Sequence, residues 1–154
     1  MTRCPGSVLA VQGADCAPVA LYSPEGVVGL AHAGWRGIEA GVLEATVALM
    51  RSHGAGEVAA LIGPHIGPSC YEFGLSDLRR LERVLGFEVA TTDRAGRPAL
   101  DVSRAISGVL GRIGVRLDHD VDRCTASSSW YWSHRAAGDR CRQAGLVVIE
   151  DRSS

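Results

Sequence analysis

The segment at residues 18–33 constrains the fold most, because it is typical of two strands joined by a tight turn. Its apolar runs, "PVALYS" (18–23) and "VVGLAHA" (27–33), are short and rich in Val and Leu. The "SPEG" between them supplies the Pro and Gly that tight turns favour. A hairpin brings its outer ends together, so we expect Cys16, just before the first strand, to neighbour His32, near the end of the second.

The remaining pattern mixes further strands with amphipathic helices. Apolar runs predict strands at 7–12, 57–63 and 144–150, and we expect further strands at 120–125 and 130–134. Apolar residues at helical spacing predict helices at 37–54, 75–86 and 100–115. Segments rich in Gly, Pro or polar residues predict loops at 63–74 and 91–98. Because the order lacks a strict strand–helix–strand rhythm, we expect an α/β fold with a mixed β-sheet layered with α-helices.

Length and composition indicate one domain and argue against several classes of partner. The chain has 154 residues, so we treat 1–154 as a single domain. A formal net charge of -1, without a basic run, argues against nucleic-acid binding. No apolar run reaches the roughly 18 residues of a membrane helix, and the N-terminus does not resemble a signal peptide. We therefore expect a cytoplasmic protein that binds neither nucleic acid nor membrane.

Cys16 and His32 carry the groups of two different kinds of site. Thiolate and imidazole are preferred zinc ligands, and a catalytic zinc site uses three protein ligands with one open position. The same groups also form nucleophilic Cys/His pairs. A buried thiol and a core histidine with one hydrogen bond would explain the pattern without any chemistry. The five cysteines are scattered and odd in number, so a disulfide framework is not expected.

The neighbours of this pair add features of an anion site. Asp15 precedes Cys16 at a strand entrance, where a carboxylate is unusual. Gly34 and Gly37 allow close backbone approach before a helix, a place suited to an anion, and Arg36 would add a forked donor. Two other segments, 63–74 and 124–143, hold polar side chains that either form a site or lie on the surface: His65, Ser69, Cys70, Tyr71, Glu72, Ser133, His134, Arg135, Arg140 and Arg142.

Several stretches, taken in order, resemble the YfiH/laccase-domain family, formerly described as multicopper polyphenol oxidases. They are "ADCAPV", "HAGWRG", "IGPHIGPSCYEFG", "LDVSRAISGVLGRIGV", "DRCT" and "WYWSHR…RQAGLVVI". The resemblance covers nearly the whole chain, and the combination of "ADC-x-PV" with "HAGWRG" is highly specific. It implies a YfiH-like layered fold. It also implies a zinc-dependent purine nucleoside phosphorylase with adenosine deaminase and methylthioadenosine phosphorylase activities.

The same resemblance assigns two zinc ligands in this chain. The cysteine of A-D-C is Cys16, and the histidine that opens H-A-G-W-R-G is His32. The family's third ligand, a histidine in a Val-His step, belongs to a segment ahead of the matched stretches. We therefore expect a domain that is N-terminally truncated relative to the family. Substitutes within the chain would be His65, Cys124 or His134.

We expect zinc held by Cys16 and His32 to assist phosphorolysis or deamination of purine nucleosides, with Arg36 and the 133–142 cluster binding phosphate. A metal-free Cys/His hydrolase and an inactive truncated remnant are the alternatives. Five dispersed histidines argue against a multicopper oxidase. A truncated domain should expose an apolar patch or an unpaired strand edge, which a second copy in a homodimer would cover.

Overall fold

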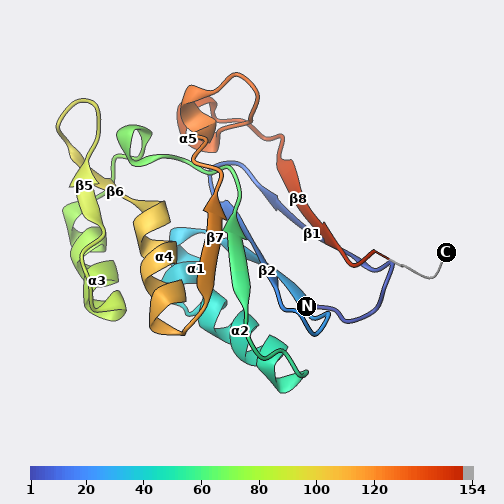
Figure 1. Ribbon diagram of the computed structural model, residues 1–154. Helices are drawn as coiled ribbons and strands as arrows, with labels where there is room; N and C mark the ends of the chain where they lie inside the picture. The colour runs from blue at the N-terminus through green and yellow to red at the C-terminus, as the bar shows by residue number, and fades with distance from the viewer. Residues whose placement is uncertain (151–154) are drawn as a thin grey trace.

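A four-stranded mixed sheet forms the centre of the computed structural model, which describes residues 1–150 (Figure 1). Its strand order is β3 (Val28–Ala33), β2 (Ala17–Tyr22), β4 (Ala59–Ile62) and β7 (Arg116–Asp120). β2 runs antiparallel to both of its neighbours, and β4 pairs with β7 in parallel. The carboxyl ends of β3, β4 and β7 therefore meet at the end of the sheet where β2 begins.

The predicted hairpin is confirmed as β2 and β3. Its ladder runs from Ala17 opposite Ala33 to Tyr22 opposite Val28, around the turn at 23–27. Alternate β2 residues are completely buried against the helices: Ala17, Val19 and Leu21. The intervening β2 residues are half-buried and lie on the other face of the sheet.

Helices cover one face of the sheet and supply most of the core (Figure 1). They are α1 (Trp35–Glu39), α2 (Val42–Ser52), α3 (Leu75–Leu85) and α4 (Val102–Arg112). The helix predicted at 37–54 is in fact two helices, because Gly41 has a left-handed φ of 79° that no continuous helix accommodates. None of the helices within residues 1–150 is both long and apolar enough to cross a membrane.

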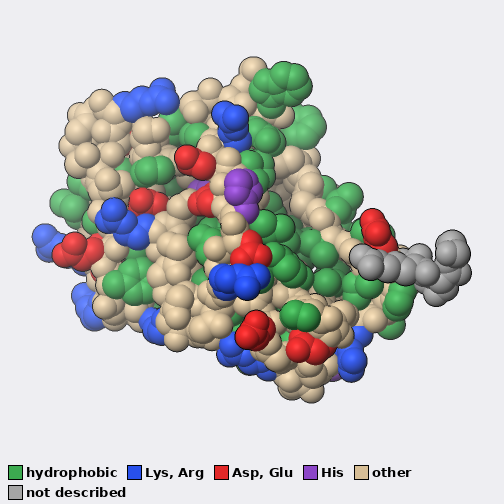
Figure 2. Space-filling model, viewed as in Figure 1, with side chains coloured by type: hydrophobic (Ala, Val, Ile, Leu, Met, Phe, Trp, Pro, Cys, Tyr) green, Lys and Arg blue, Asp and Glu red, His purple; other side chains and the backbone are tan. Residues whose placement is uncertain are grey.

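A two-stranded ribbon packs on the side of the sheet opposite the helices. It pairs β1 (Val8–Gly13) with β8 (Gln143–Val148) in antiparallel register. Each strand keeps one unpaired edge, and Val8, Leu146 and Val148 are 60%, 65% and 50% exposed. Hydrophobic side chains are visible over this side of the molecule (Figure 2). The expected unpaired edge and exposed apolar surface are thus both present.

The structure corrects three local predictions. The loop at 91–98 is instead the turn of a small hairpin, β5 (Ala90–Thr92) and β6 (Pro98–Leu100). The strand expected at 120–125 lies earlier, as β7, and a 3-10 turn, η2 (Thr125–Ser127), follows it. The strand expected at 130–134 is irregular and leads into α5 (His134–Ala137). The mixed sheet and helical layer nevertheless confirm the expected fold class.

Candidate functional site

Cys16 and His32 meet at the end of the sheet where β2 begins. The ladder pairs Pro18 with His32 and ends at Ala17 opposite Ala33, so Cys16 and Gly34 face each other one position beyond its last pair. A Cβ atom on Gly34 would lie only 2.7 Å from Sγ of Cys16 and 3.7 Å from Nε2 of His32. The thiol and the imidazole therefore border the same small volume, which is free because residue 34 has no side chain. The hairpin thus brings the two residues together, as the sequence predicted.

A backbone hydrogen bond orients the imidazole of His32. Its Nδ1 atom lies 2.9 Å from the carbonyl oxygen of Gln12 at the end of β1. Since a carbonyl oxygen only accepts, Nδ1 donates its proton there and Nε2 keeps a free lone pair toward Cys16. A metal-binding histidine commonly has this second contact, which fixes the ring and its tautomer.

The surroundings of Cys16 keep its sulfur in the thiol form in the metal-free chain. Burial and the negative charge of Asp15 raise the pKa of the thiol, and the positive charge of Arg142 opposes them. A free nucleophilic cysteine usually needs the reverse, a positive environment that lowers its pKa. A bound divalent cation would reverse the local charge and deprotonate a coordinating thiol.

Asp15 joins three distant segments beside Cys16. It is buried and has a φ of 88°, a conformation that Asp tolerates better than most residues. Its carboxylate accepts hydrogen bonds of 2.7 Å from the hydroxyl of Thr125 and from the backbone N–H of Arg135. Its carbonyl accepts one of 2.9 Å from the N–H of Ile66. The loops after β4 and β7 are therefore fastened directly to the residue before Cys16.

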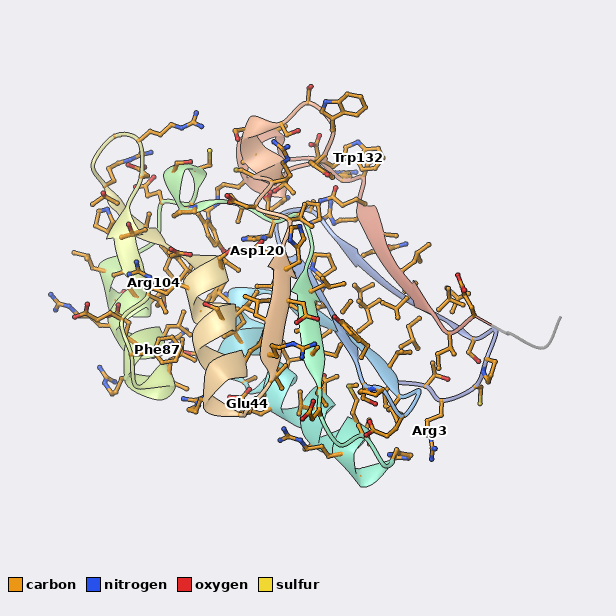
Figure 3. All side chains as sticks on the ribbon, viewed as in Figure 1. Arg3, Glu44, Phe87, Arg104, Asp120 and Trp132 are labelled. Carbon is orange, nitrogen blue, oxygen red and sulfur yellow. The ribbon has the colours of Figure 1, made fainter. Side chains whose placement is uncertain are left out.

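No third metal ligand joins Cys16 and His32 within residues 1–150. Over that range no group of three or more His, Cys, Asp or Glu side chains is placed to hold a metal. His65 is occupied elsewhere: Nδ1 contacts the Gly63 carbonyl and Nε2 the Ser103 hydroxyl, both at 2.9 Å. That hydroxyl donates to Asp120 at the end of β7, which Figure 3 labels.

The other two suggested substitutes also have different surroundings. The Cys124 sulfur accepts a 3.2 Å hydrogen bond from the N–H of Gly67 and borders another cavity, together with His65. His134 is exposed and begins α5. Within residues 1–150 none of the three possible substitutes, His65, Cys124 and His134, is grouped with Cys16 and His32.

One cavity includes the Cys16–His32 pair in its wall, and a second shares Tyr131 with it. The first measures about 110 Å³ and includes both side chains, Pro64 and Gln143 in its wall. That volume is well below the roughly 300–1,000 Å³ typical of small-molecule sites. Tyr131 also lines this cavity and a second one of about 450 Å³, with Trp130 in the wall of the latter. A ligand larger than the first cavity that contacts Cys16 and His32 would therefore have to extend beyond that cavity.

The residues expected to bind an anion divide into two groups. The guanidinium of Arg36 lies 4.6 Å from the ring centre of Trp35, and that of Arg135 lies 4.9 Å from Tyr71. Arg142 is close enough to Cys16 to affect its pKa. Ser133, by contrast, caps α5, because its hydroxyl accepts a 3.1 Å hydrogen bond from the N–H of Ala136. Its position is explained by that structural role.

Sequence reasoning missed some residues of the site and marked others. The unusual carboxylate before a strand correctly drew attention to Asp15, although its partners are more than a hundred positions away. Tyr131 and Gln143 line the cavity without any signal in the local sequence. Gln143 reaches it because β8 returns to pair with β1, and only the tertiary structure shows that.

The comparisons with known proteins point to one family. A family model described as "Multi-copper polyphenol oxidoreductase laccase" matches residues 1–150. A Deinococcus radiodurans protein named purine nucleoside phosphorylase is 34% identical over 155 residues, covering 99% of this chain and 61% of that protein. Purine nucleoside phosphorylase YfiH of Escherichia coli is 32% identical, covering 94% of this chain and 60% of that protein.

Solved structures show the same partial overlap. YlmD from Geobacillus stearothermophilus matches with a TM-score of 0.79 at 30% identity, covering 97% of this chain and 59% of that one. A Bacillus licheniformis protein called YfiH matches with a TM-score of 0.80 at 26% identity, covering 96% of this chain and 60% of that one. The chain thus spans about three-fifths of the length of the proteins that it matches.

Proposed function

Because the chain belongs to the multi-copper polyphenol oxidoreductase laccase family, we propose that it forms the zinc-binding part of a purine nucleoside phosphorylase. The likeness to the solved YfiH and YlmD structures confirms the YfiH-like fold that the sequence motifs predicted. Several relatives carry the name purine nucleoside phosphorylase, which supports that activity as the first choice.

The observation that carries the proposal is the convergence of Cys16 Sγ and His32 Nε2 on the space beside Gly34. Sulfur and imidazole nitrogen are the donors that zinc prefers, and the second nitrogen of His32 is already committed to Gln12. The donor set therefore fits zinc in kind. It supplies two of the three protein ligands that a catalytic site takes, so a third donor would come from outside residues 1–150.

Zinc in this place would supply Lewis-acid chemistry. The residues of this chain would bind and orient the phosphate and the nucleoside. In phosphorolysis, a phosphate oxygen forms a bond to C1′ of the ribose and the bond to the purine nitrogen breaks. Arg36 and Arg135 would hold the phosphate, and their charges would offset the negative charge there. Asp15 keeps Arg135 beside the site through the backbone bond described above.

The purine would lie in the cavity of about 450 Å³ that Tyr131 shares with the Cys16–His32 cavity. Its wall includes the ring of Trp130, which is 89% exposed and so available for stacking. Planar bases gain free energy by stacking on aromatic side chains. Methylthioadenosine phosphorolysis and adenosine deamination would use the same pocket; in deamination water attacks C6 of the purine and the amino group leaves as ammonia.

A copper oxidase of phenols fits the described residues less well, despite the family's name. Multicopper chemistry needs several imidazoles together. Here Nδ1 of His53 contacts the carbonyl of Leu49 on α2, both nitrogens of His65 are occupied, and His134 begins α5. Within residues 1–150 only His32 borders the volume beside Gly34 that Cys16 occupies.

Chromatography of inosine or adenosine, incubated with the chain, zinc and phosphate, tests the proposal. We expect slow, phosphate-dependent release of the free base, abolished by Cys16→Ser and by His32→Ala. A version fused to the remaining segment of the Deinococcus radiodurans relative should be faster. No phosphate-dependent release from either version would contradict the proposal. Rapid alkylation of Cys16 by iodoacetamide, unaffected by chelators, would then favour a metal-free Cys/His hydrolase.

The cellular setting and the assembly belong to the same proposal. We place the enzyme in the cytoplasm, acting on purine nucleosides and phosphate. A homodimer that covers the exposed apolar side chains of β1 and β8 is the assembly that we propose. Sedimentation of the chain at increasing concentration measures that assembly directly.

A further inference from the structure

Tyr71 is held rigidly in the loop after β4. Its N–H donates to the carbonyl of Pro68 at 3.1 Å, and its own carbonyl accepts from the N–H of Leu100 at 3.2 Å. Its ring lies edge-on to Phe73, with 5.4 Å between ring centres, and the guanidinium of Arg135 covers it at 4.9 Å. The phenol therefore has a fixed position rather than a choice of rotamers.

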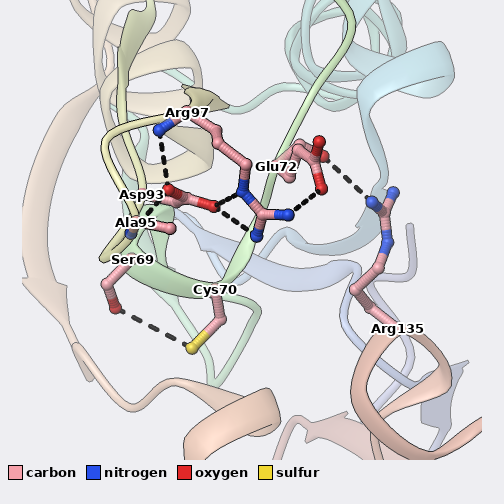
Figure 4. Close-up of polar contacts among 7 residues, drawn as sticks. All are labelled: Ser69, Cys70, Glu72, Asp93, Ala95, Arg97 and Arg135. Carbon is pink, nitrogen blue, oxygen red and sulfur yellow. Dashed lines mark hydrogen bonds and ion pairs between the residues drawn. The ribbon is translucent and has the colours of Figure 1, made fainter.

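Glu72, the residue after Tyr71, contacts two arginines, one through its backbone and one through its side chain (Figure 4). The carbonyl of Glu72 accepts a 2.9 Å hydrogen bond from Arg135. The carboxylate of Glu72 pairs with Arg97 at 2.9 Å, and Arg97 in turn pairs with Asp93 at 2.7 Å. These contacts hold Tyr71 between the hairpin of β5 and β6 and the segment that contains α5.

Arg135 connects this phenol to the Cys16–His32 site. Its backbone N–H donates to the carboxylate of Asp15, the residue before Cys16, while its side chain covers Tyr71. Arg135 therefore contacts Asp15 through its backbone and Tyr71 through its guanidinium group. The ring of Phe73 continues the cluster, because it also packs edge-on against Trp35 at 5.3 Å.

Arg36 approaches the same cluster from the other side. Its guanidinium lies over Trp35, and within residues 1–150 it makes neither an ion pair nor a hydrogen bond. Over the same range the hydroxyl of Tyr71 has no hydrogen-bond partner either. Arg36 and Arg135 thus flank the aromatic cluster of Trp35, Phe73 and Tyr71 from two sides, and the Arg36 guanidinium and the Tyr71 hydroxyl keep unused hydrogen-bonding capacity.

The phenol keeps its proton at neutral pH. Burial raises the pKa of Tyr71 to about 12; the negative charges that Cys16 and Asp15 carry when ionised raise it further, while the positive charges of Arg135 and Arg36 lower it. A neutral hydroxyl next to two guanidinium groups can donate to an anionic oxygen but offers no negative charge that would repel one.

We propose that Tyr71 donates its hydroxyl hydrogen to the phosphate that Arg36 and Arg135 hold, and so strengthens phosphate binding for phosphorolysis. This inference rests on the proposed phosphorylase function and adds a donor to its phosphate site. Loss of one hydrogen bond to a charged group typically weakens binding about 10–100-fold. The effect should fall on phosphate and not on the nucleoside.

Tyr71→Phe is the variant that tests this, since it removes the hydroxyl and keeps the ring against Phe73 and Arg135. We expect an increase of about 10-fold or more in the KM for phosphate, with the KM for the nucleoside and the rate of deamination unchanged. Tyr22→Phe is the matched control, because Tyr22 lies at the far end of β2 and its hydroxyl bonds to Asp118. It should leave all three quantities as they are.

A binding measurement separates this inference from the proposed function. Titration of inorganic phosphate, followed by phosphorus NMR line broadening, needs no turnover. Weaker phosphate binding by Tyr71→Phe, when neither the chain nor its fused version releases purine, would support the phosphate donor and reject the phosphorylase function. Equal phosphate binding by Tyr71→Phe and the unchanged chain would overturn the inference, as would no phosphate binding at all.

Discussion

Cys16 and Gly34 lie opposite one another across the β2–β3 hairpin, and the thiol occupies the volume that a side chain at position 34 would need. The glycine is therefore part of the site, although it contributes no functional group. Its absent side chain lets the sulfur approach the edge of His32, whose Nε2 borders the same space.

Gly34→Ala should damage metal binding more than stability. The new methyl group would lie 2.7 Å from the Cys16 sulfur, so the thiol has to rotate away from His32. The sulfur ends a side chain with only one rotatable bond, and rotation costs little. We expect zinc affinity to fall at least about 10-fold while the melting temperature changes by only a few degrees. Competition with a fluorescent zinc chelator measures the affinity.

Gly111→Ala provides the control for that variant. Position 111 lies in α4, where an added Cβ meets nothing within 4 Å. Alanine in a helix is favoured over glycine by about 0.5–1 kcal/mol, so this variant should unfold at slightly higher temperature with zinc binding unchanged. A loss of zinc binding here equal to that of Gly34→Ala would show that the effect is not local.

Asp15→Asn should weaken the connection between the hairpin and the segment at 125–135. The carboxylate accepts from both Thr125 and the N–H of Arg135, and an amide group can accept only one of these two bonds. We expect the free energy of unfolding to fall by about 2 kcal/mol in urea titrations. Hydrogen exchange of the Arg135 amide should also become faster.

Thr125→Val separates the two bonds of Asp15, because it removes only the hydroxyl donor. Its cost should be smaller, about 1 kcal/mol, with the Arg135 amide still protected. If both variants were as stable as the unchanged chain, Asp15 would not be the residue that fastens these loops.

The hairpin and the Cys16–His32 pair could be predicted because they depend on local sequence. The strand period, the "SPEG" turn and the equal distances from it determine which residues face each other. The contacts of Asp15 could not, since Thr125 and Arg135 lie more than a hundred residues away. The pairing of β1 with β8, which adds Gln143 to the cavity, likewise joins the two ends of the chain.

The local errors also have physical causes. The segment at 130–134 is rich in aromatic residues, which favour strands, but no neighbouring strand pairs with it. The polar residues at 91–98 predicted a loop, yet their two ends pair as β5 and β6 because a tight turn forms at 93–97. In both cases the presence or absence of a partner strand, rather than propensity, decided the structure.

Alkaline titration should show Tyr71 as a tyrosine that ionises late. Its pKa of about 12 exceeds the usual value of about 10, because burial disfavours the phenolate. The unfolded chain therefore loses this proton first, so its contribution to stability is complete below pH 10 and disappears as the pH rises through about 12. Absorbance at the phenolate band follows the ionisation.

Tyr71→Phe identifies the late step in that titration. The variant should lose the phase near pH 12 and keep the others, and its stability should depend less on pH above 10. An unchanged titration curve in the variant would assign the late step to another group.

The chain alone should hold zinc weakly, because Cys16 and His32 are two ligands and not three. We expect less than one zinc per chain by plasma mass spectrometry after gel filtration. Fusion to the remaining segment of the Deinococcus radiodurans relative should raise this toward one. Stoichiometric zinc in the chain alone would mean that another donor, such as one from a second copy, completes the site.

Titration with cobalt(II) in excess tests the central claim most directly, because a thiolate bound to cobalt gives a charge-transfer band in the near ultraviolet. The account predicts this band for the unchanged chain and its loss in Cys16→Ser. Cys124→Ser should retain it, although hydrogen bonds from Ser127 and from the Gly67 amide outweigh burial and lower the pKa of that thiol. A band that survives in Cys16→Ser, or disappears in Cys124→Ser, would contradict the account.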